Sequence, residues 1–93
     1  MINVLKIIPT SRFNKDLKLA KKRGYKLELL QKVITKLSAE ETLDDKYRDH
    51  NLEGEYKGFR ECHITPDWLL IYKTIDDELL LILSRTGTHS DLF

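Results

Sequence analysis

One stretch in the second half of the chain decides its fold: residues 58–72, GFRECHITPDWLLIY. Residues 59–64 alternate in polarity, which is typical of a strand with one buried face. Thr65-Pro66-Asp67 is typical of a turn. Residues 68–73 are nearly all apolar, as in a central strand that is covered on both faces. The stretch therefore predicts two neighbouring strands joined by a short turn.

The chain before this stretch begins with a predicted strand. Residues 2–8 are rich in β-branched side chains, and we expect the strand to stop at Pro9, which cannot donate to a ladder. Thr10 or Ser11 is expected to cap a helix, because a hydroxyl accepts from the free N–H groups of a first turn. The inner face of this helix carries Phe13, Leu17 and Ala20.

A second helix is predicted from Leu27 to Leu37. Gly24 separates it from the first helix and follows the basic run 21–23, and both glycine and cations suit a helix C-terminus. The inner stripe of the second helix is Leu27, Leu30, Ile34 and Leu37. We expect a helical hairpin that turns through Gly24 and Tyr25, with its lysines on the outside.

The remaining segments complete a sheet. Residues 38–51 are polar and acidic and are interpreted as a loop, and residues 55–58 and 76–78 as turns. Residues 79–83 predict a last apolar strand, which Thr86-Gly87-Thr88 should break. The element order is β-α-α-β-β-β and ends in an antiparallel meander. Two helices against one sheet make a two-layer α+β fold.

Composition favours one small domain, which we expect to span residues 1–93. The chain is 41% hydrophobic and 33% charged, enough for a core and typical of an ordered protein. We expect no secretory signal and no membrane span, because no apolar run approaches about 20 residues. Cys62 is the one cysteine, which excludes an internal disulfide and suits a cytoplasmic protein with an inert, buried thiol.

The net charge of +1 hides a segregation along the chain. Residues 1–36 contain ten basic and two acidic residues, a net charge of +8, and residues 37–93 carry −7. One interpretation is an ordinary solvated helix face. The other is an electrostatic surface for a polyanion or an acidic partner.

Three histidines, His50, His63 and His89, each lie at or near the end of a predicted element. Imidazole exchanges protons in both directions near neutral pH, so these rings are candidates for acid–base catalysis. Taken singly, each is more often an exposed or core histidine without a task. Their spacing with Asp67 matches no metal-ligand motif, and we expect no metal and no other cofactor.

Strand parity places His63 on the face opposite Cys62 and Ile64, away from the helices. Asp67 follows across the turn, where it could pair with His63 or simply cap the turn. Arg60 and Arg85 flank the region and suit phosphate, although each could be in a surface salt bridge. Trp68 is expected in the core, with base stacking as the alternative.

Three motifs together give the chain a resemblance to a known family. They are residues 49–54, DHNLEG, residues 58–72, quoted above, and residues 85–93, RTGTHSDLF. They closely resemble the YafQ branch of the RelE/ParE toxin superfamily, and the similarity covers the whole chain in length and element order. The basic helical hairpin matches that family only loosely.

The resemblance implies a RelE-like fold and the toxin of a bacterial type II toxin–antitoxin system. It implies an endoribonuclease that cleaves mRNA in the A site of the 70S ribosome. The implied partners are a cognate antitoxin of the DinJ/RelB kind and, through the toxin–antitoxin complex, operator DNA. By the same resemblance His50, His63, Asp67 and His89 fall on catalytic positions. Positions for binding or placing the substrate are Trp68, Arg85 and Phe93.

The implied chemistry suits these residues. Metal-free RNA cleavage uses the 2′-hydroxyl as nucleophile and needs a base, an acid and cationic groups for the phosphate. We assign His89 as the acid, His50 or His63 as base or phosphate ligand, and Asp67 as an orienting or proton-accepting partner. Arg85, with Arg60 nearby, is expected to hold the phosphate.

Two other classes of protein stay open. A ParE-like topoisomerase poison would share the fold and an antitoxin, but it has no need of proton-transfer groups. A non-catalytic nucleic-acid-binding module would use the lysine-rich helices and show a steep salt dependence.

Overall fold

Five strands and three α-helices make up the described chain, residues 4–93 of a computed structural model. In chain order they are β1 (Lys6–Pro9), α1 (Ser11–Lys22), α2 (Leu27–Ser38), β2 (His50–Asn51), β3 (Arg60–Thr65), β4 (Trp68–Ile75), β5 (Leu80–Gly87) and α3 (His89–Leu92). Short 3-10 turns are η1 (Asp45–Tyr47), η2 (Gly54–Tyr56) and η3 (Asp76–Glu78).

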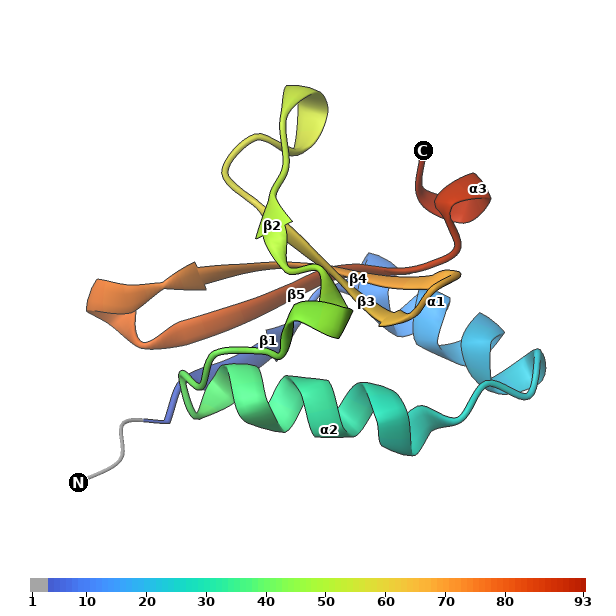
Figure 1. Ribbon diagram of the computed structural model, residues 1–93, viewed down its shortest axis with the longest axis horizontal. Helices are drawn as coiled ribbons and strands as arrows, with labels where there is room; N and C mark the ends of the chain where they lie inside the picture. The colour runs from blue at the N-terminus through green and yellow to red at the C-terminus, as the bar shows by residue number, and fades with distance from the viewer. Residues whose placement is uncertain (1–3) are drawn as a thin grey trace.

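The strands form one sheet in the order β1-β5-β4-β3-β2, with β1 parallel to β5 and the other pairs antiparallel. Figure 1 shows α2 on one side of the sheet, and β2 with its loop and α3 rising on the other. The predicted α+β architecture and the terminal meander β3-β4-β5 are confirmed. Among residues 4–93, no helix is long and apolar enough to span a bilayer.

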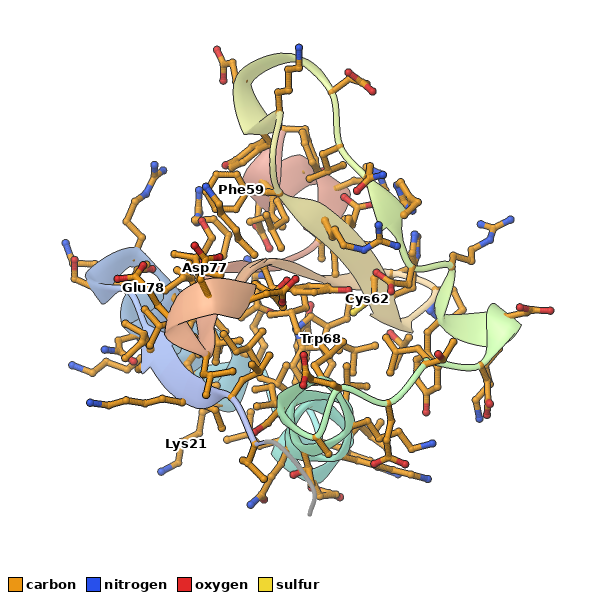
Figure 2. The ribbon with its side chains drawn as sticks, turned by 90° about the vertical axis from the view of Figure 1, so that its left-hand side faces the viewer. Lys21, Phe59, Cys62, Trp68, Asp77 and Glu78 are labelled. Carbon is orange, nitrogen blue, oxygen red and sulfur yellow. The ribbon has the colours of Figure 1, made fainter. Side chains whose placement is uncertain are left out.

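Strand β4 is buried on both faces, as its apolar run predicted. Leu70 packs toward α1 and α2, whereas Leu69 and Ile71 pack on the opposite side against Leu92 of α3. Figure 2 shows Trp68 on the side of α2 and Phe59 on the other. The cluster under the helices is the larger: Leu5, Phe13, Ala20, Leu30, Val33, Leu37, Leu43, Tyr47, Cys62, Ile64, Trp68, Leu70, Tyr72, Leu81 and Leu83.

Both ends of α1 follow from capping chemistry. The Thr10 side chain accepts from the Phe13 backbone N–H at 3.1 Å, which identifies Thr10 rather than Ser11 as the N-cap of α1. Gly24 ends the α1 region with a φ of +80°, a conformation that glycine adopts without steric cost. The predicted second helix is confirmed, and it extends one residue further, to Ser38.

The first strand is shorter than the sequence predicts. It begins at Lys6; residues 2 and 3 lie outside the described chain, and Val4 and Leu5 precede the strand. The Leu5 N–H donates to the Ser38 carbonyl, and the Ser38 hydroxyl donates to the Leu5 carbonyl. Leu5 therefore pairs with the end of α2, which leaves it no backbone groups for the sheet.

The predicted break of the last strand at Thr86 is wrong. β5 continues to Gly87, because Thr86 and Gly87 pair with Leu70 and Leu69 of β4 across a register shift. Three short elements were also not predicted. The expected loop 38–51 contains η1 and β2, and the tail forms α3.

Candidate active site

Three imidazole rings form a row on the sheet face opposite α1 and α2. His50 comes from β2, His63 from β3 and His89 from the first position of α3. The ring centroid of His63 lies 6.4 Å from that of His50 and 6.3 Å from that of His89. His63 reaches this face because Cys62 and Ile64, its neighbours in the strand, are buried under the helices. The structure thus brings together all three histidines that the sequence singled out.

Glu61 is a buried carboxylate between the first two rings. Its side chain is 4% exposed, and its Oε1 atom lies 3.4 Å from His50 Nε2 and 3.6 Å from His63 Nε2. The pairing of β2 with β3 sets His50 directly opposite Glu61. Glu61 was not predicted from the sequence. The available signal was its i, i+2 spacing from His63, which places both side chains on one face of a strand.

Backbone carbonyls orient the rings of both histidines that face Glu61. His50 Nδ1 lies 2.6 Å from the Arg48 carbonyl, and His63 Nδ1 lies 3.4 Å from the Pro66 carbonyl. Since a carbonyl oxygen only accepts, each Nδ1 is the donor, and Nε2 is the nitrogen left for proton exchange. Each ring therefore presents Nε2 to the carboxylate of Glu61.

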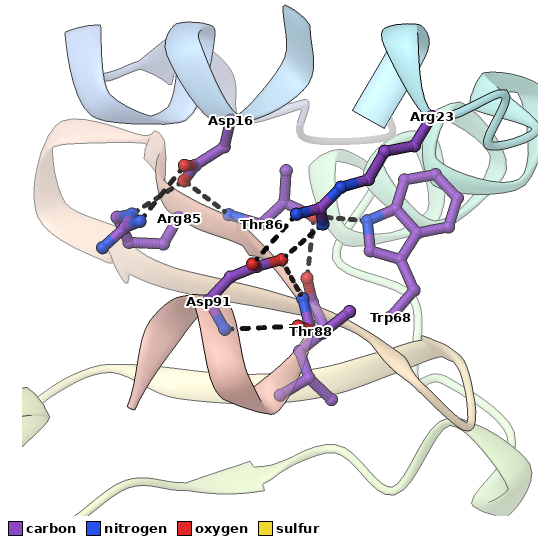
Figure 3. Close-up of polar contacts among 8 residues, drawn as sticks. Asp16, Arg23, Trp68, Arg85, Thr86, Thr88 and Asp91 are labelled. Carbon is purple, nitrogen blue, oxygen red and sulfur yellow. Dashed lines mark hydrogen bonds and ion pairs between the residues drawn. The ribbon is translucent and has the colours of Figure 1, made fainter. Parts of the chain in front are cut away.

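His89 depends on the placement of α3, which is only four residues long. A helix of this length has no stability of its own. Asp91 fixes it twice: its carboxylate accepts from the Thr88 backbone N–H in a capping box, and it forms a two-point pair with Arg23, at 2.7 and 3.2 Å (Figure 3). The Arg23 guanidinium holds the pKa of Asp91 well below its usual range. α1 thereby holds the helix that carries His89.

Arg85 forms a two-point ion pair with Asp16 of α1, with Nε at 2.7 Å and Nη2 at 3.1 Å from the two carboxylate oxygens (Figure 3). This pair raises the pKa of Arg85. Asp16 also accepts from the Thr86 N–H, on the β5 edge that β1 leaves open after Leu83. The salt-bridge alternative for Arg85 is thus present, and it leaves Nη1 outside the pair.

Arg60 is not brought to the histidine row. It shares strand parity with Cys62, on the helix side of the sheet, and it donates to Asp49 at 3.2 Å and Asn51 at 2.8 Å. The Tyr72 hydroxyl donates to the same Asp49 carboxylate. A role for Arg60 in holding substrate stays a prediction from sequence.

Asp67 and Trp68 are neighbours in sequence but lie in different surroundings, Asp67 at the surface and Trp68 in the core. Within residues 4–93 no ion pair joins Asp67 to His63; Asp67 instead lines a hollow of about 400 Å³ with His89. Trp68 is 3% exposed, and its Nε1 donates to the Thr86 hydroxyl at 2.8 Å, which confirms the core interpretation of this ring.

Aromatic side chains continue the row beyond His89. Phe93 is 60% exposed, and its ring centroid lies 5.6 Å from that of His89 and 5.7 Å from that of Tyr56. Tyr56, in the turn before β3, was not predicted at the site. Among residues 4–93, no group of three or more His, Cys, Asp or Glu side chains has an arrangement that would hold a metal ion.

A mixed sheet with helices on one face and this row on the other defines a small α+β protein of the RelE-like toxin class. Residues 5–93 match the family model described as the bacterial toxin of type II toxin–antitoxin system, YafQ. The chain belongs to the YafQ family.

Individual relatives agree with this assignment. The mRNA interferase toxin YafQ of Escherichia coli (strain K12) is 44% identical over 85 residues, 90% of each chain. A metal-bound toxin from Helicobacter pylori superposes with a TM-score of 0.90 at 48% identity, covering 96% of this chain and 99% of that one. The toxin of the E. coli DinJ-YafQ complex gives 0.87 at 42% identity, covering 96% and 97%.

Proposed function

We propose that the chain cleaves mRNA in the A site of the ribosome, without a metal, by acid–base catalysis from its histidine row. The general activity follows from the family: the chain is a type II toxin and an endoribonuclease of the mRNA interferase kind. The observation that carries the mechanism is the shared carboxylate of Glu61 between His50 and His63, with His89 next in the row.

The first step is removal of the proton from the substrate 2′-hydroxyl. His50 and His63 each offer Nε2, and either nitrogen can take this proton while the hydroxyl oxygen attacks the adjacent phosphorus. Glu61 then stabilises the imidazolium that has formed, because its Oε1 atom lies beside the Nε2 atoms of both rings. We therefore treat His50, Glu61 and His63 as one proton-accepting unit.

The second step is departure of the 5′-oxygen. His89 donates a proton to this oxygen as its bond to phosphorus breaks, which leaves a 2′,3′-cyclic phosphate and a 5′-hydroxyl. Arg85 donates from Nη1 to the phosphate oxygens, where negative charge builds up in the transition state. Asp16 holds the guanidinium in place for this contact.

The remaining predicted site residues have supporting roles in this mechanism. Asp67 shares a hollow with His89 and is the orienting partner on the acid side. Phe93 offers an exposed ring for a base beside His89, and Trp68 supports the site from the core. Arg60 reaches substrate only if the RNA extends around the β2 edge.

The proposed partners follow the family. A complex with DinJ has been solved for YafQ of E. coli, and we expect a cognate antitoxin of the DinJ/RelB kind here, with operator DNA bound through the complex. The net charge of +8 in residues 1–36 suits an acidic antitoxin segment or ribosomal RNA. A ribosomal substrate places the toxin in the cytoplasm.

The deciding experiment is induced expression in a bacterial host, with primer-extension mapping of transcripts. Wild type is expected to arrest growth and to cut translated mRNA in frame, whereas His89→Ala loses both effects. Glu78→Ala, an exposed change in η3, is the control that keeps both. Growth arrest without transcript cleavage would replace this proposal with the topoisomerase-poison alternative, and a toxic, cutting His89→Ala would remove His89 from the chemistry.

A further inference from the structure

Two adjoining hollows lie by the α1–α2 turn and the β3–β4 turn, and one of them extends to His89 of α3. The first, of about 400 Å³, is lined by His89, Asp67, Tyr25, Thr88 and Ser90. The second, of about 500 Å³, also has Tyr25 and Asp67 in its wall and reaches Trp68. Because they share two walls, they form one trough that starts at the candidate acid and leads away from it.

Tyr25 lines both hollows of this trough, and its aromatic ring packs against Trp68. Its centroid lies 5.0 Å from that of Trp68. Trp68 is in turn fixed by its bond to the Thr86 hydroxyl, which donates to the Leu69 carbonyl (Figure 3). Tyr25 is only half-buried, so part of its ring faces the trough. A ring held in this way loses little conformational entropy when a flat ligand stacks on it.

The lining of the hollow at His89 selects a base over a phosphate. It contains no lysine or arginine, and the Asp67 carboxylate would repel a phosphate group. The cation Lys26 lines the second hollow only. A carboxylate accepts from the N–H groups on the Watson–Crick edge of a base, and an aromatic ring stacks on the base itself. Guanine offers two adjacent N–H donors, which match the two carboxylate oxygens best.

We propose that this trough is a nucleobase subsite, in which Tyr25 is the stacking platform and Asp67, in addition to its part beside His89, accepts from the edge of the base. A carboxylate can do both, because each of its oxygens has two acceptor sites. The inference rests on the proposed function in one respect. His89, as the acid, must lie close to the 5′-oxygen that it protonates. The base beside His89 is then that of the nucleotide on the 3′ side of the cut, which carries this oxygen away. The subsite thereby reads the nucleotide after the cleaved bond.

Binding can be tested without any cleavage. Trp68 is the only tryptophan, so its indole N–H gives one NMR signal that reports on the ring beside Tyr25. Titration with guanosine is expected to shift this signal more than uridine does, and ribose 5-phosphate should leave it unmoved. Tyr25→Phe keeps the guanosine shift, and Tyr25→Leu, which keeps apolar bulk against Trp68, loses it. Equal shifts from ribose 5-phosphate, or unchanged guanosine binding by Tyr25→Leu, would overturn the subsite.

Cleavage on mRNA-programmed ribosomes separates this inference from the proposed function. Tyr25→Leu is expected to cut about tenfold more slowly than wild type at equal ribosome binding, since stacking on one aromatic ring contributes about 1–3 kcal/mol per base. Cleavage by Tyr25→Leu at the wild-type rate sinks the subsite and leaves the nuclease intact. Tyr25-dependent guanosine binding by a chain that cuts no mRNA supports the subsite and removes the proposed function. A thermal melt of each variant shows that it is folded.

Discussion

Glu61 is a buried carboxylate that lies beside two imidazole rings of the candidate active site. A carboxylate that is 4% exposed is costly to hold ionised unless it has charged or hydrogen-bonding partners. Its nearest such partners are two imidazole rings, at 3.4 and 3.6 Å, whose other nitrogens face backbone carbonyls. A group in this position stabilises positive charge on the rings at the moment when one of them takes up a proton. The proton-accepting unit that we propose therefore includes a residue that is not a histidine.

Glu61→Gln is expected to lower kcat for mRNA cleavage about 100-fold, the lower end of what one acid–base step contributes. The amide keeps the shape of the side chain but removes the negative charge, so binding of the ribosome should not change. Single-turnover cleavage with a separate ribosome-binding assay measures both. Glu78→Gln loses the same charge in exposed η3 and should behave as wild type. Wild-type kcat in Glu61→Gln would exclude the carboxylate from the reaction.

Single residues also show where prediction from sequence ends. Parity along β3 correctly separates His63 from Cys62, because alternation is a local property of an extended chain. The pairing of Arg85 with Asp16 joins positions 69 residues apart, and no local pattern specifies which of many acids Arg85 will meet. Glu61 was overlooked for a related reason: a glutamate is usually solvated, and only the neighbouring β2 strand makes this one shared.

At the scale of elements, α3 is the part of the site that is built from distant contacts. It has four residues, so its position comes from Asp91, Thr88 and the end of α1. Gly87 permits the close approach, since a side chain there would come within 3.0 Å of Asp91. This dependence explains why α3 was not predicted, whereas α1 and α2 were. The longer helices carry apolar stripes that repeat over several turns, whereas the four residues of α3 are too few to show such a pattern, although Thr88 and Asp91 cap it.

Asp91→Asn is expected to lower the free energy of unfolding by about 1 kcal/mol at neutral pH, through loss of the pair with Arg23 and weakening of the cap. The pKa of Asp91 is lowered in the folded chain, mainly by its bonds to Arg23, so the unfolded chain binds a proton first as pH falls. The stabilisation is complete above the unfolded pKa of about 4 and is lost progressively below it.

Chemical denaturation of wild type and Asp91→Asn at a series of pH values measures this contribution. The difference between the two chains should be constant from about pH 7 to 5 and should shrink below about pH 4. Arg23→Gln removes the other half of the pair and is expected to show the same trend, while Lys22→Gln, one position earlier on α1, serves as the charge-matched control. A difference that persists unchanged at pH 2 would show that the ion pair does not hold α3.

In the whole molecule, the sheet lies between the residues of the main core and the candidate catalytic residues. The larger apolar cluster lies under α1 and α2, and the histidine row lies on the opposite face with a smaller cluster. The helices also carry most of the basic residues of the N-terminal part, so a polyanion can bind them without covering the histidines. The segregation of charge was visible in the sequence. That α1 and α2 lie on the sheet face opposite the histidine row depends on the strand order and packing of the sheet, which local patterns do not specify.

This separation predicts that stability and activity respond to different substitutions. His50→Ala and His89→Ala remove exposed rings and should change the free energy of unfolding by less than about 1 kcal/mol, although His89→Ala is expected to abolish cleavage. Leu70→Ala opens a cavity at a fully buried position of β4 and should cost about 2–5 kcal/mol, while the molecules that remain folded cut mRNA normally. Urea denaturation and cleavage assays on the same samples test both halves. Losses of several kcal/mol in the histidine variants would mean that the row is part of the core, and that the two faces are not independent.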